Sequence, residues 1–268
     1  MFRHEGRKIY ESRDEVGVLE VVEHKGVRSL HFGTDSRQSS MLLAEPDNLE
    51  LSYVRAMTSW LLFKSEWNQA LIIGLGGGSL TKFLLQQFPD CRLKAVERRP
   101  SVVKIARSHF GLPFDSRLKI IIGDGGDYVR RTAREIQEQY DLLLVDAFDH
   151  DGMADSISNE VFFDACKRLL KNDGILVINL WGGTKNPLFQ QVALWMSRIF
   201  DWKMLFLPVR NRGNIIALAF SDKMPVVPLK DIKAKAVALE HQLNIEFSKF
   251  LIDLCKHNAS TIKQVITK

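Results

Sequence analysis

The chain contains 268 residues, of which 46% are hydrophobic and 26% are charged, and its formal net charge is +5. This composition is ordinary for a globular protein, and the length suits one main domain of about 200 residues with small appendages. No apolar run is long enough to span a bilayer and the first residues lack a secretory h-region, so we expect a cytoplasmic protein without membrane contact.

The first predicted element is a β-hairpin. Residues 15–32 alternate apolar and polar side chains in two runs, Gly17–Glu23 and Val27–Phe32, and residues 24–26 separate the runs. Alternation with a period of two, interrupted by a short polar turn that contains glycine, is typical of two antiparallel strands. We therefore expect a small N-terminal β-hairpin domain over residues 1–50.

The stretch from Ala70 to Glu97 is the most informative part of the chain. An apolar strand leads into a glycine cluster (GLGGGS), a helix follows, and a second strand ends on an acid. Glycines let the backbone approach a ligand closely, the helix N-terminus offers free N–H groups, and the acid can accept hydrogen bonds from ribose hydroxyls. This order predicts an adenosine-containing cofactor, held by Gly74, Gly76, Gly77, Ser79 and Glu97.

The type of cofactor follows from the loop and from a second acid. A dinucleotide site would need a third glycine in G-x-G-x-x-G, and no glycine follows Ser79 at that spacing. A third apolar strand, Leu118–Ile122, runs into Asp124 and Gly125, where a carboxylate at the edge of the sheet can accept a hydrogen bond from an adenine amino group. Together these features describe a site of the S-adenosylmethionine type.

A fourth strand, Tyr140–Val145, delivers further acids to the same edge. It is nearly all apolar, as a strand covered on both faces must be, and Asp146 and Asp149 follow it. Several carboxylates then face one crevice beside the cofactor loop, which favours a functional cluster over a solvated loop.

The remaining elements complete a sheet. We expect a helix over Asn159–Leu170 that ends before Gly174, and then strands at Ile175–Leu180, Lys203–Val209 and Asn214–Phe220. Seven strands with interleaved helices give a doubly wound α/β sheet.

The boundaries of this organisation also follow from the pattern. The sheet occupies residues 51–222 as a cofactor-binding catalytic domain. Residues 223–268 form a C-terminal helical extension, with one helix or a helix pair over residues 229–256.

These motifs resemble those of the spermidine synthases and related polyamine aminopropyltransferases. The resemblance covers about residues 17–220 and implies a seven-stranded, methyltransferase-like (Rossmann-like) fold. It rests on the following segments: Ile72–Gly78 (IIGLGGG), Val96–Glu97, Gly123–Gly125, Tyr140–Asp141, the pair Asp146-x-x-Asp149, Phe162–Phe163 and Leu169–Gly174.

The resemblance implies that an amine attacks the aminopropyl carbon of decarboxylated S-adenosylmethionine and releases methylthioadenosine. By position in the motifs, Glu97 would hold the ribose and Asp124 the adenine. Asp149 would bind and deprotonate the attacking amine, and Asp146 would line the same pocket.

Four more positions bear on the resemblance. Gln38 resembles a glutamine that touches the cofactor, and Tyr53 resembles a tyrosine of the amine pocket. Ser79 departs from the family, which has at this place an acid that pairs with the amino group of the decarboxylated cofactor. Arg55 likewise stands where the family has an acid, so its orientation bears on whether a polycation is accepted.

Three functions stay open at this point, in the order aminopropyltransferase, S-adenosylmethionine-dependent methyltransferase and non-catalytic adenosine-binding homologue. The basic residues are spread and lack interleaved aromatic side chains, so a nucleic-acid partner is not favoured. The family resemblance implies a homo-oligomer. The widely separated Cys91, Cys166 and Cys255 predict reduced thiols, and we expect no metal.

Overall fold

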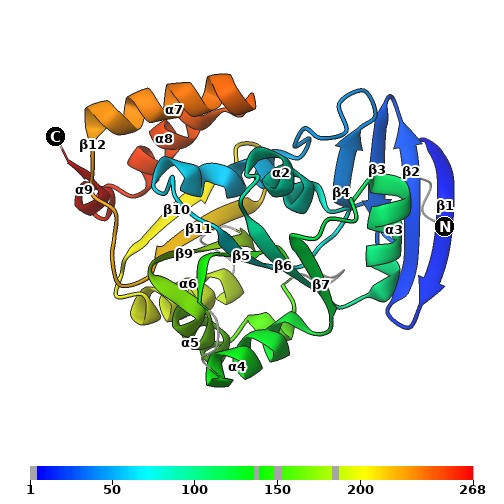
Figure 1. Cartoon of the computed structure of the whole chain (residues 1–268), viewed down its shortest axis with the longest axis horizontal. Coiled ribbons are helices and arrows are strands. Elements are labelled where there is room, and N and C mark those ends of the chain that lie inside the picture. Colours follow the sequence, from blue (N-terminus) through cyan, green and yellow to red (C-terminus); the bar gives the residue numbers. More distant parts are fainter. Residues whose placement is uncertain (1–4, 136–138, 148–152, 183–186, 268) are drawn as a thin grey trace.

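The computed structural model describes residues 5–135, 139–147, 153–182 and 187–267, and a seven-stranded sheet runs through its centre (Figure 1). The strand order is β10-β11-β9-β8-β5-β6-β7. The bounds are Gln69–Ile73 (β5), Arg92–Glu97 (β6), Leu118–Ile122 (β7), Tyr140–Val145 (β8), Leu170–Trp181 (β9), Met204–Pro208 (β10) and Asn214–Phe220 (β11). The five strands from β5 to β9 are parallel, and β11 runs antiparallel to both β9 and β10. The expected doubly wound, methyltransferase-like sheet is confirmed.

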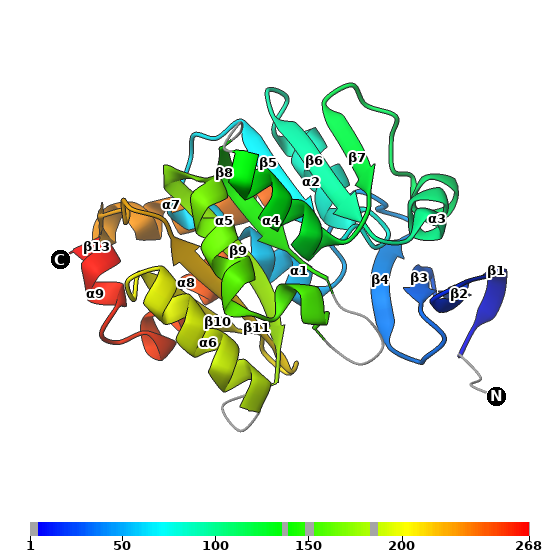
Figure 2. The same cartoon turned by 90° about the horizontal axis from the view of Figure 1, so that it is seen from below.

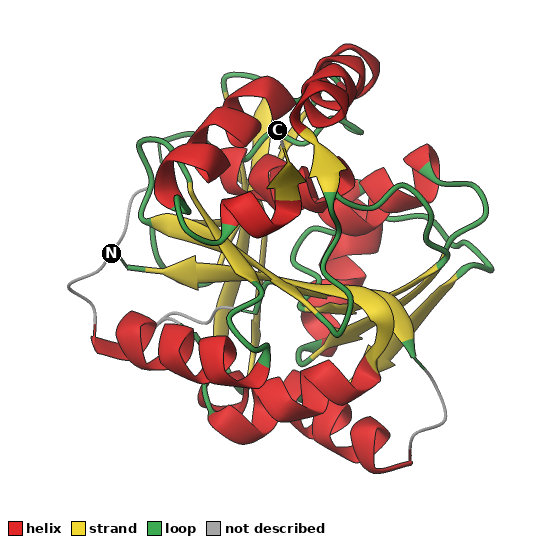
Figure 3. Cartoon of the chain, turned by 90° about the vertical axis from the view of Figure 1, so that its left-hand side faces the viewer, coloured by secondary structure: helices red, strands yellow, loops and turns green. Residues whose placement is uncertain are grey.

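Helices cover both faces of this sheet (Figure 3). One face carries α2 (Ser79–Gln87), α7 (Leu229–Leu243) and α8 (Phe247–His257), and the other carries α4 (Gly125–Glu135), α5 (Glu160–Leu169) and α6 (Pro187–Ile199). Side chains of β5 alternate between the two cores: Ala70 and Ile72 pack on one side, and Leu71 and Ile73 on the other. Strands buried on both faces therefore read as continuous apolar runs.

The strand order reverses between β5 and β8. Chain connections leave β5 toward β6 and β7 on one side, whereas β8 and β9 lie on the other side. In sheets of this kind the carboxyl ends of the strands leave a crevice at such a reversal, and ligands bind there. The glycine loop after β5 and the acid after β8 both stand at this point.

A second, four-stranded antiparallel sheet lies at one end of the molecule (Figure 2). Its strands are β1 (Arg7–Asp14), β2 (Gly17–His24), β3 (Val27–His31) and β4 (Arg37–Leu42). The predicted hairpin is confirmed as β2 and β3, with Lys25 and Gly26 at positive φ in the turn. The sequence did not identify β1 and β4. Helix α3 (Pro100–Phe110) packs its apolar face on this sheet and thereby joins it to the central one.

One predicted boundary is wrong. Helix α5 ends at Leu169, and β9 begins at Leu170, so Gly174 lies inside the strand and does not end the helix. Leu170 already pairs with Tyr140 of β8, and the register shifts before the regular pairing of Leu142 with Ile175. Tertiary pairing thus starts the strand earlier than the glycine signal indicates.

The C-terminal segment forms the helix pair α7 and α8, followed by α9 (Ile262–Val265) and the short strands β12 (Val227–Pro228) and β13 (Ile266–Thr267). Phe247, Phe250, Leu251 and Leu254 of α8 are buried, whereas Val237 of α7 is exposed. None of the helices in the described part of the chain is long and apolar enough to cross a membrane.

Candidate active site

The glycine loop turns sharply between β5 and α2. Gly74 has φ +89°, and a β-carbon there would lie 2.1 Å from the carbonyl oxygen of Asp146. A β-carbon on Gly77 would lie 2.6 Å from Ser39 Oγ. Close packing within the chain therefore requires glycine at both positions. This reason is separate from the cofactor contact that the sequence predicts. Gly76 also has a positive φ, but a β-carbon there would come no closer than 3.6 Å to the atoms of other segments.

Glu97 ties this loop to the end of β6. One carboxylate oxygen accepts a hydrogen bond from the Leu75 amide at 3.0 Å, and the other accepts one from the Arg99 amide at 2.9 Å. The side chain is buried, and burial raises the pKa of its carboxyl above the ordinary value. The acid at the strand end thus orders the loop that is expected to receive the cofactor.

Asp124 stands at the end of the neighbouring strand. Its carboxylate accepts a hydrogen bond from the Asp127 amide at 3.0 Å, at the start of α4. The Gly123 amide donates to the Glu97 carbonyl at 3.0 Å, which brings the ends of β6 and β7 together. A β-carbon on Gly125 would lie 2.3 Å from Ile73, so only glycine lets α4 begin this close to β5.

Asp146 follows β8 and is held by two donors. The Tyr53 hydroxyl lies 3.3 Å from one carboxylate oxygen, and the Asn179 amide donates to the other at 2.9 Å. The Asn214 amide in turn donates to the Asn179 side-chain oxygen at 3.0 Å. An ionised carboxylate only accepts hydrogen bonds, so it dictates the orientation of both asparagine amides and makes Tyr53 the donor.

Burial governs the protonation of this cluster. It raises the pKa of Asp146 above its usual value, and it raises the pKa of the Tyr53 phenol well above its usual value, with the Asp146 charge as a further cause. Tyr53 therefore stays protonated as a donor, and Asp146 is the acceptor that faces it.

Strand β4 of the N-terminal sheet lies over the glycine loop. The Gln38 carbonyl oxygen is 3.5 Å from the Tyr53 hydroxyl, and Ser39 Oγ is 3.4 Å from Ser79 Oγ. Ser79 Oγ also lies 3.4 Å from the Ser40 carbonyl oxygen. Segments that are far apart in the sequence thus meet on one side of the loop.

Most of the predicted site residues gather at this edge of the sheet. The structure brings two groups of them together directly. The first contains Asp146, Tyr53 at its carboxylate, Gly74 at its main-chain carbonyl and Gln38 at the Tyr53 hydroxyl, and the second contains Gly76, Gly77, Ser79 and Glu97 along the loop. Asp124 and Gly125 flank them at the ends of β7 and β5. Asp149 lies outside the described residues, so its role stays a prediction.

Sequence reasoning missed Asn179 and Asn214. Asn179 is the single polar residue in the run Ile175–Leu180, and it is buried, as is Asn214. A buried amide needs partners. One polar residue near the carboxyl end of an apolar strand was the available signal for Asn179.

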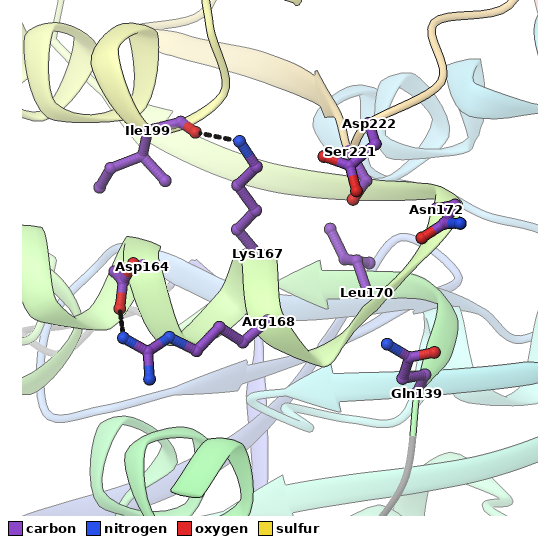
Figure 4. A pocket seen from close by; sticks show the side chains of 9 residues that line it. All are labelled: Gln139, Asp164, Lys167, Arg168, Leu170, Asn172, Ile199, Ser221 and Asp222. Carbon is purple, nitrogen blue, oxygen red and sulfur yellow. Dashed lines mark hydrogen bonds and ion pairs between the residues drawn. The ribbon is translucent and has the colours of Figure 1, made fainter. Parts of the chain in front are cut away.

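A separate surface pocket of about 410 Å³ lies at the opposite edge of the sheet (Figure 4). Gln139 and Leu170, which line it, stand at the amino ends of β8 and β9. Both cations that line it have local partners, since Lys167 donates to the Ile199 carbonyl at 2.7 Å and Arg168 pairs with Asp164 at 2.8 Å. It is distinct from the site at the glycine loop. No group of three potential metal ligands occurs among the described residues.

Three comparisons, two of the sequence and one of the structure, show which known proteins this chain is similar to. Residues 51–203 match the family model described as the spermine/spermidine synthase domain. A polyamine aminopropyltransferase of Neisseria meningitidis is 35% identical over 265 residues, which cover 98% of each chain. A mouse eEF1A lysine and N-terminal methyltransferase is 36% identical over 116 residues, which cover 41% of this chain and 17% of that protein.

Among solved structures, a spermidine synthase in complex with the transition-state analogue AdoDATO superposes with a TM-score of 0.69. The match covers 96% of this chain and 87% of that chain, at 19% sequence identity. At this identity the likeness shows a shared fold.

Proposed function

This chain belongs to the spermine/spermidine synthase family, and we propose that it transfers an aminopropyl group from decarboxylated S-adenosylmethionine to an amine such as putrescine. The observation that carries this proposal is the carboxylate of Asp146, held between Tyr53 and Asn179 at the end of β8, next to the glycine loop. A buried anion at the cofactor loop suits a substrate that arrives as a cation.

The chemistry requires a carboxylate. An aliphatic amine has a pKa near that of lysine, about 10, so it arrives protonated and cannot attack. The amine first gives a proton to a carboxylate, for which the sequence motif favours Asp149. The nitrogen of the deprotonated amine then attacks the aminopropyl carbon of decarboxylated S-adenosylmethionine. The bond between that carbon and sulfur breaks, and its electron pair stays on sulfur in methylthioadenosine. General-base help of this kind accelerates a reaction by about 10² to 10⁴.

The residues around the glycine loop would form the part of the active site that binds the cofactor. Glu97 would bind the ribose hydroxyls and Asp124 the adenine amino group, and Gln38 would cover the cofactor from the N-terminal sheet. The contacts of Glu97 with two backbone amides support this role, because they fix the carboxylate at the loop. A cytoplasmic location and a homo-oligomeric state belong to the same proposal.

One observation favours a second candidate, an S-adenosylmethionine-dependent methyltransferase. Ser79 begins α2 where the family has an acid, and a serine at a helix N-terminus tolerates the carboxylate of intact S-adenosylmethionine. The segment shared with the mouse methyltransferase points the same way. A homologue that binds the adenosine ligand without turnover is the third candidate.

The deciding experiment measures dissociation constants for decarboxylated and intact S-adenosylmethionine, in the wild type and in Ser79→Asp. We expect the wild type to bind both within about tenfold, a difference of roughly 1.4 kcal/mol. Ser79→Asp adds an ion pair to the amine of the decarboxylated form and repels the carboxylate of the other, so it should favour the former.

Labelled transfer assays complete the test. Transfer of the aminopropyl label to an amine supports the first candidate. A preference of about a hundredfold for intact S-adenosylmethionine, together with methyl transfer, would replace it by the methyltransferase.

A further inference from the structure

Helix α1 (Ser52–Ala56) presents two side chains in nearly opposite directions. Tyr53 and Arg55 are two positions apart, which turns them by about 200° around a helix. The Tyr53 hydroxyl faces Asp146, whereas the Arg55 guanidinium pairs with Glu246 of the C-terminal extension. The arginine that replaces the family's acid is therefore directed away from Asp146.

The Arg55 guanidinium makes four hydrogen bonds. Nε and Nη2 donate to the two carboxylate oxygens of Glu246 at 2.9 and 3.2 Å, and Nη1 donates to the carbonyl oxygens of Leu49 at 3.0 Å and Glu50 at 2.6 Å. A forked pair of this kind fixes direction as well as distance. This pair joins α1 to Glu246, which lies 191 positions after Arg55 in the sequence.

Tertiary contacts position helix α1, and those of Arg55 are among them. It has five residues, and no side chain caps its N-terminus at Leu51. A helix this short has little stability of its own, so its position is set by tertiary contacts. The carbonyl groups that Arg55 holds lie directly before the helix, and Tyr53 moves with them.

The backbone at Glu246 is anchored by its buried neighbours. It stands between α7 and α8, and its neighbours Ile245 and Phe247 are buried in the hydrophobic cluster that also contains Val54 and Met57. Figure 1 shows α7 and α8, in orange, beside the light-blue segment that follows the N-terminal sheet. The Glu246 carboxylate therefore binds Arg55 of α1 from a backbone that the C-terminal helices hold in place.

We propose that Glu246 is a positioning residue for the amine half of the site: it neutralises Arg55 and holds α1 so that the Tyr53 hydroxyl stays on Asp146. This role rests on the proposed aminopropyl transfer. Glu246 lies outside residues 51–203, which match the family model. Without its carboxylate, the partly buried Arg55 would lose the acid with which it pairs.

The test is Glu246→Gln in the full-length protein, which keeps the shape of the side chain and removes its charge. We expect the KM for the amine to rise at least about tenfold, while the KM for decarboxylated S-adenosylmethionine and the dissociation constant of methylthioadenosine change by less than about twofold. The KM for the amine is expected to change more than the KM for decarboxylated S-adenosylmethionine because Glu246 acts on Tyr53 and not on the glycine loop.

Asp253→Asn is the matched control. Asp253 lies on α8 and accepts two hydrogen bonds from Arg210, at 2.7 and 2.8 Å, so this variant also breaks a forked ion pair of the C-terminal extension. It should leave both KM values unchanged. Equal effects of the two variants on the amine KM, or a parallel loss of amine and cofactor binding in Glu246→Gln, would overturn the proposal.

A readout without turnover separates this inference from the function itself. Hydrogen exchange of residues 49–56 should accelerate in Glu246→Gln relative to Asp253→Asn, while exchange of residues 69–80 stays unchanged. If the wild type transfers no aminopropyl group, the proposed function fails on that result alone. If exchange of residues 49–56 is the same in both variants, the positioning role fails whatever the activity.

Discussion

Replacement of Gly74 by alanine tests the close approach of the glycine loop to β8. The new β-carbon would lie 2.1 Å from the carbonyl oxygen of Asp146, 2.8 Å from its carbonyl carbon and 3.3 Å from the α-carbon of Ala147. All three are backbone atoms that no rotamer change can move. The end of β8 would have to shift by about 1 Å or more to restore van der Waals distances.

The expected cost has two parts. An alanine forced to positive φ loses about 1–2 kcal/mol, and overpacking of a close-packed site costs about 1–3 kcal/mol more. We therefore expect Gly74→Ala to lower the free energy of unfolding by about 2–5 kcal/mol. Because the shift displaces Asp146, aminopropyl transfer should fall even at temperatures where the variant stays folded.

Gly76→Ala separates the two parts. Gly76 has φ +53°, but a β-carbon there would lie 3.6 Å from Ser39 Cβ, its nearest neighbour outside residues 75–77, which is an ordinary contact. This variant should show only the conformational cost of about 1–2 kcal/mol. Urea unfolding of the wild type and both variants measures the difference. Equal stability of the two variants would refute the claim that contact with Asp146, and not the dihedral angle, makes Gly74 necessary.

Three further outcomes are expected. Asp149→Asn should lower turnover by roughly 10² or more while methylthioadenosine binding and the melting temperature hold; activity at the wild-type level, or failure to fold, would make Asp149 a structural acid. Glu97→Ala removes a charged acceptor worth about 1.5–3 kcal/mol per hydrogen bond, so methylthioadenosine binding should weaken at least about tenfold in calorimetry; unchanged affinity would contradict the assignment to the ribose. Burial raises the pKa of Asp146, so the stability linked to its protonation is present in full below the pKa of the unfolded carboxyl and is lost as the pH rises through the raised folded value. The wild type should therefore lose stability relative to Asp146→Asn as the pH rises above the ordinary aspartate pKa of about 4, and parallel stability curves would show that the raised pKa is absent.

The sequence alone determined the features that are local. The glycine loop, the acids after β6, β7 and β8, and the alternating hairpin each lie within a short stretch whose periodicity and turn residues predict the element. The number of strands and the doubly wound class follow because apolar strands alternate with helices along the chain, whereas the order of the strands was not predicted. One predicted boundary is nevertheless wrong. Gly174 lies within β9, because pairing of Leu170 with β8 outweighs the tendency of glycine to end a helix.

The tertiary structure decided what no local pattern carries. Strand β4 brings Gln38 and Ser39 next to the glycine loop, and Asn179 and Asn214 join Asp146 in one chain of hydrogen bonds, although these segments are distant in the sequence. The sequence left open whether Arg55 faces the amine pocket. Its partner, Glu246, stands 191 residues further along the chain, and the two meet only because the C-terminal helices pack beside α1. A side chain's direction depends on which distant group satisfies its hydrogen bonds and charge, and that pairing exists only once the chain has folded.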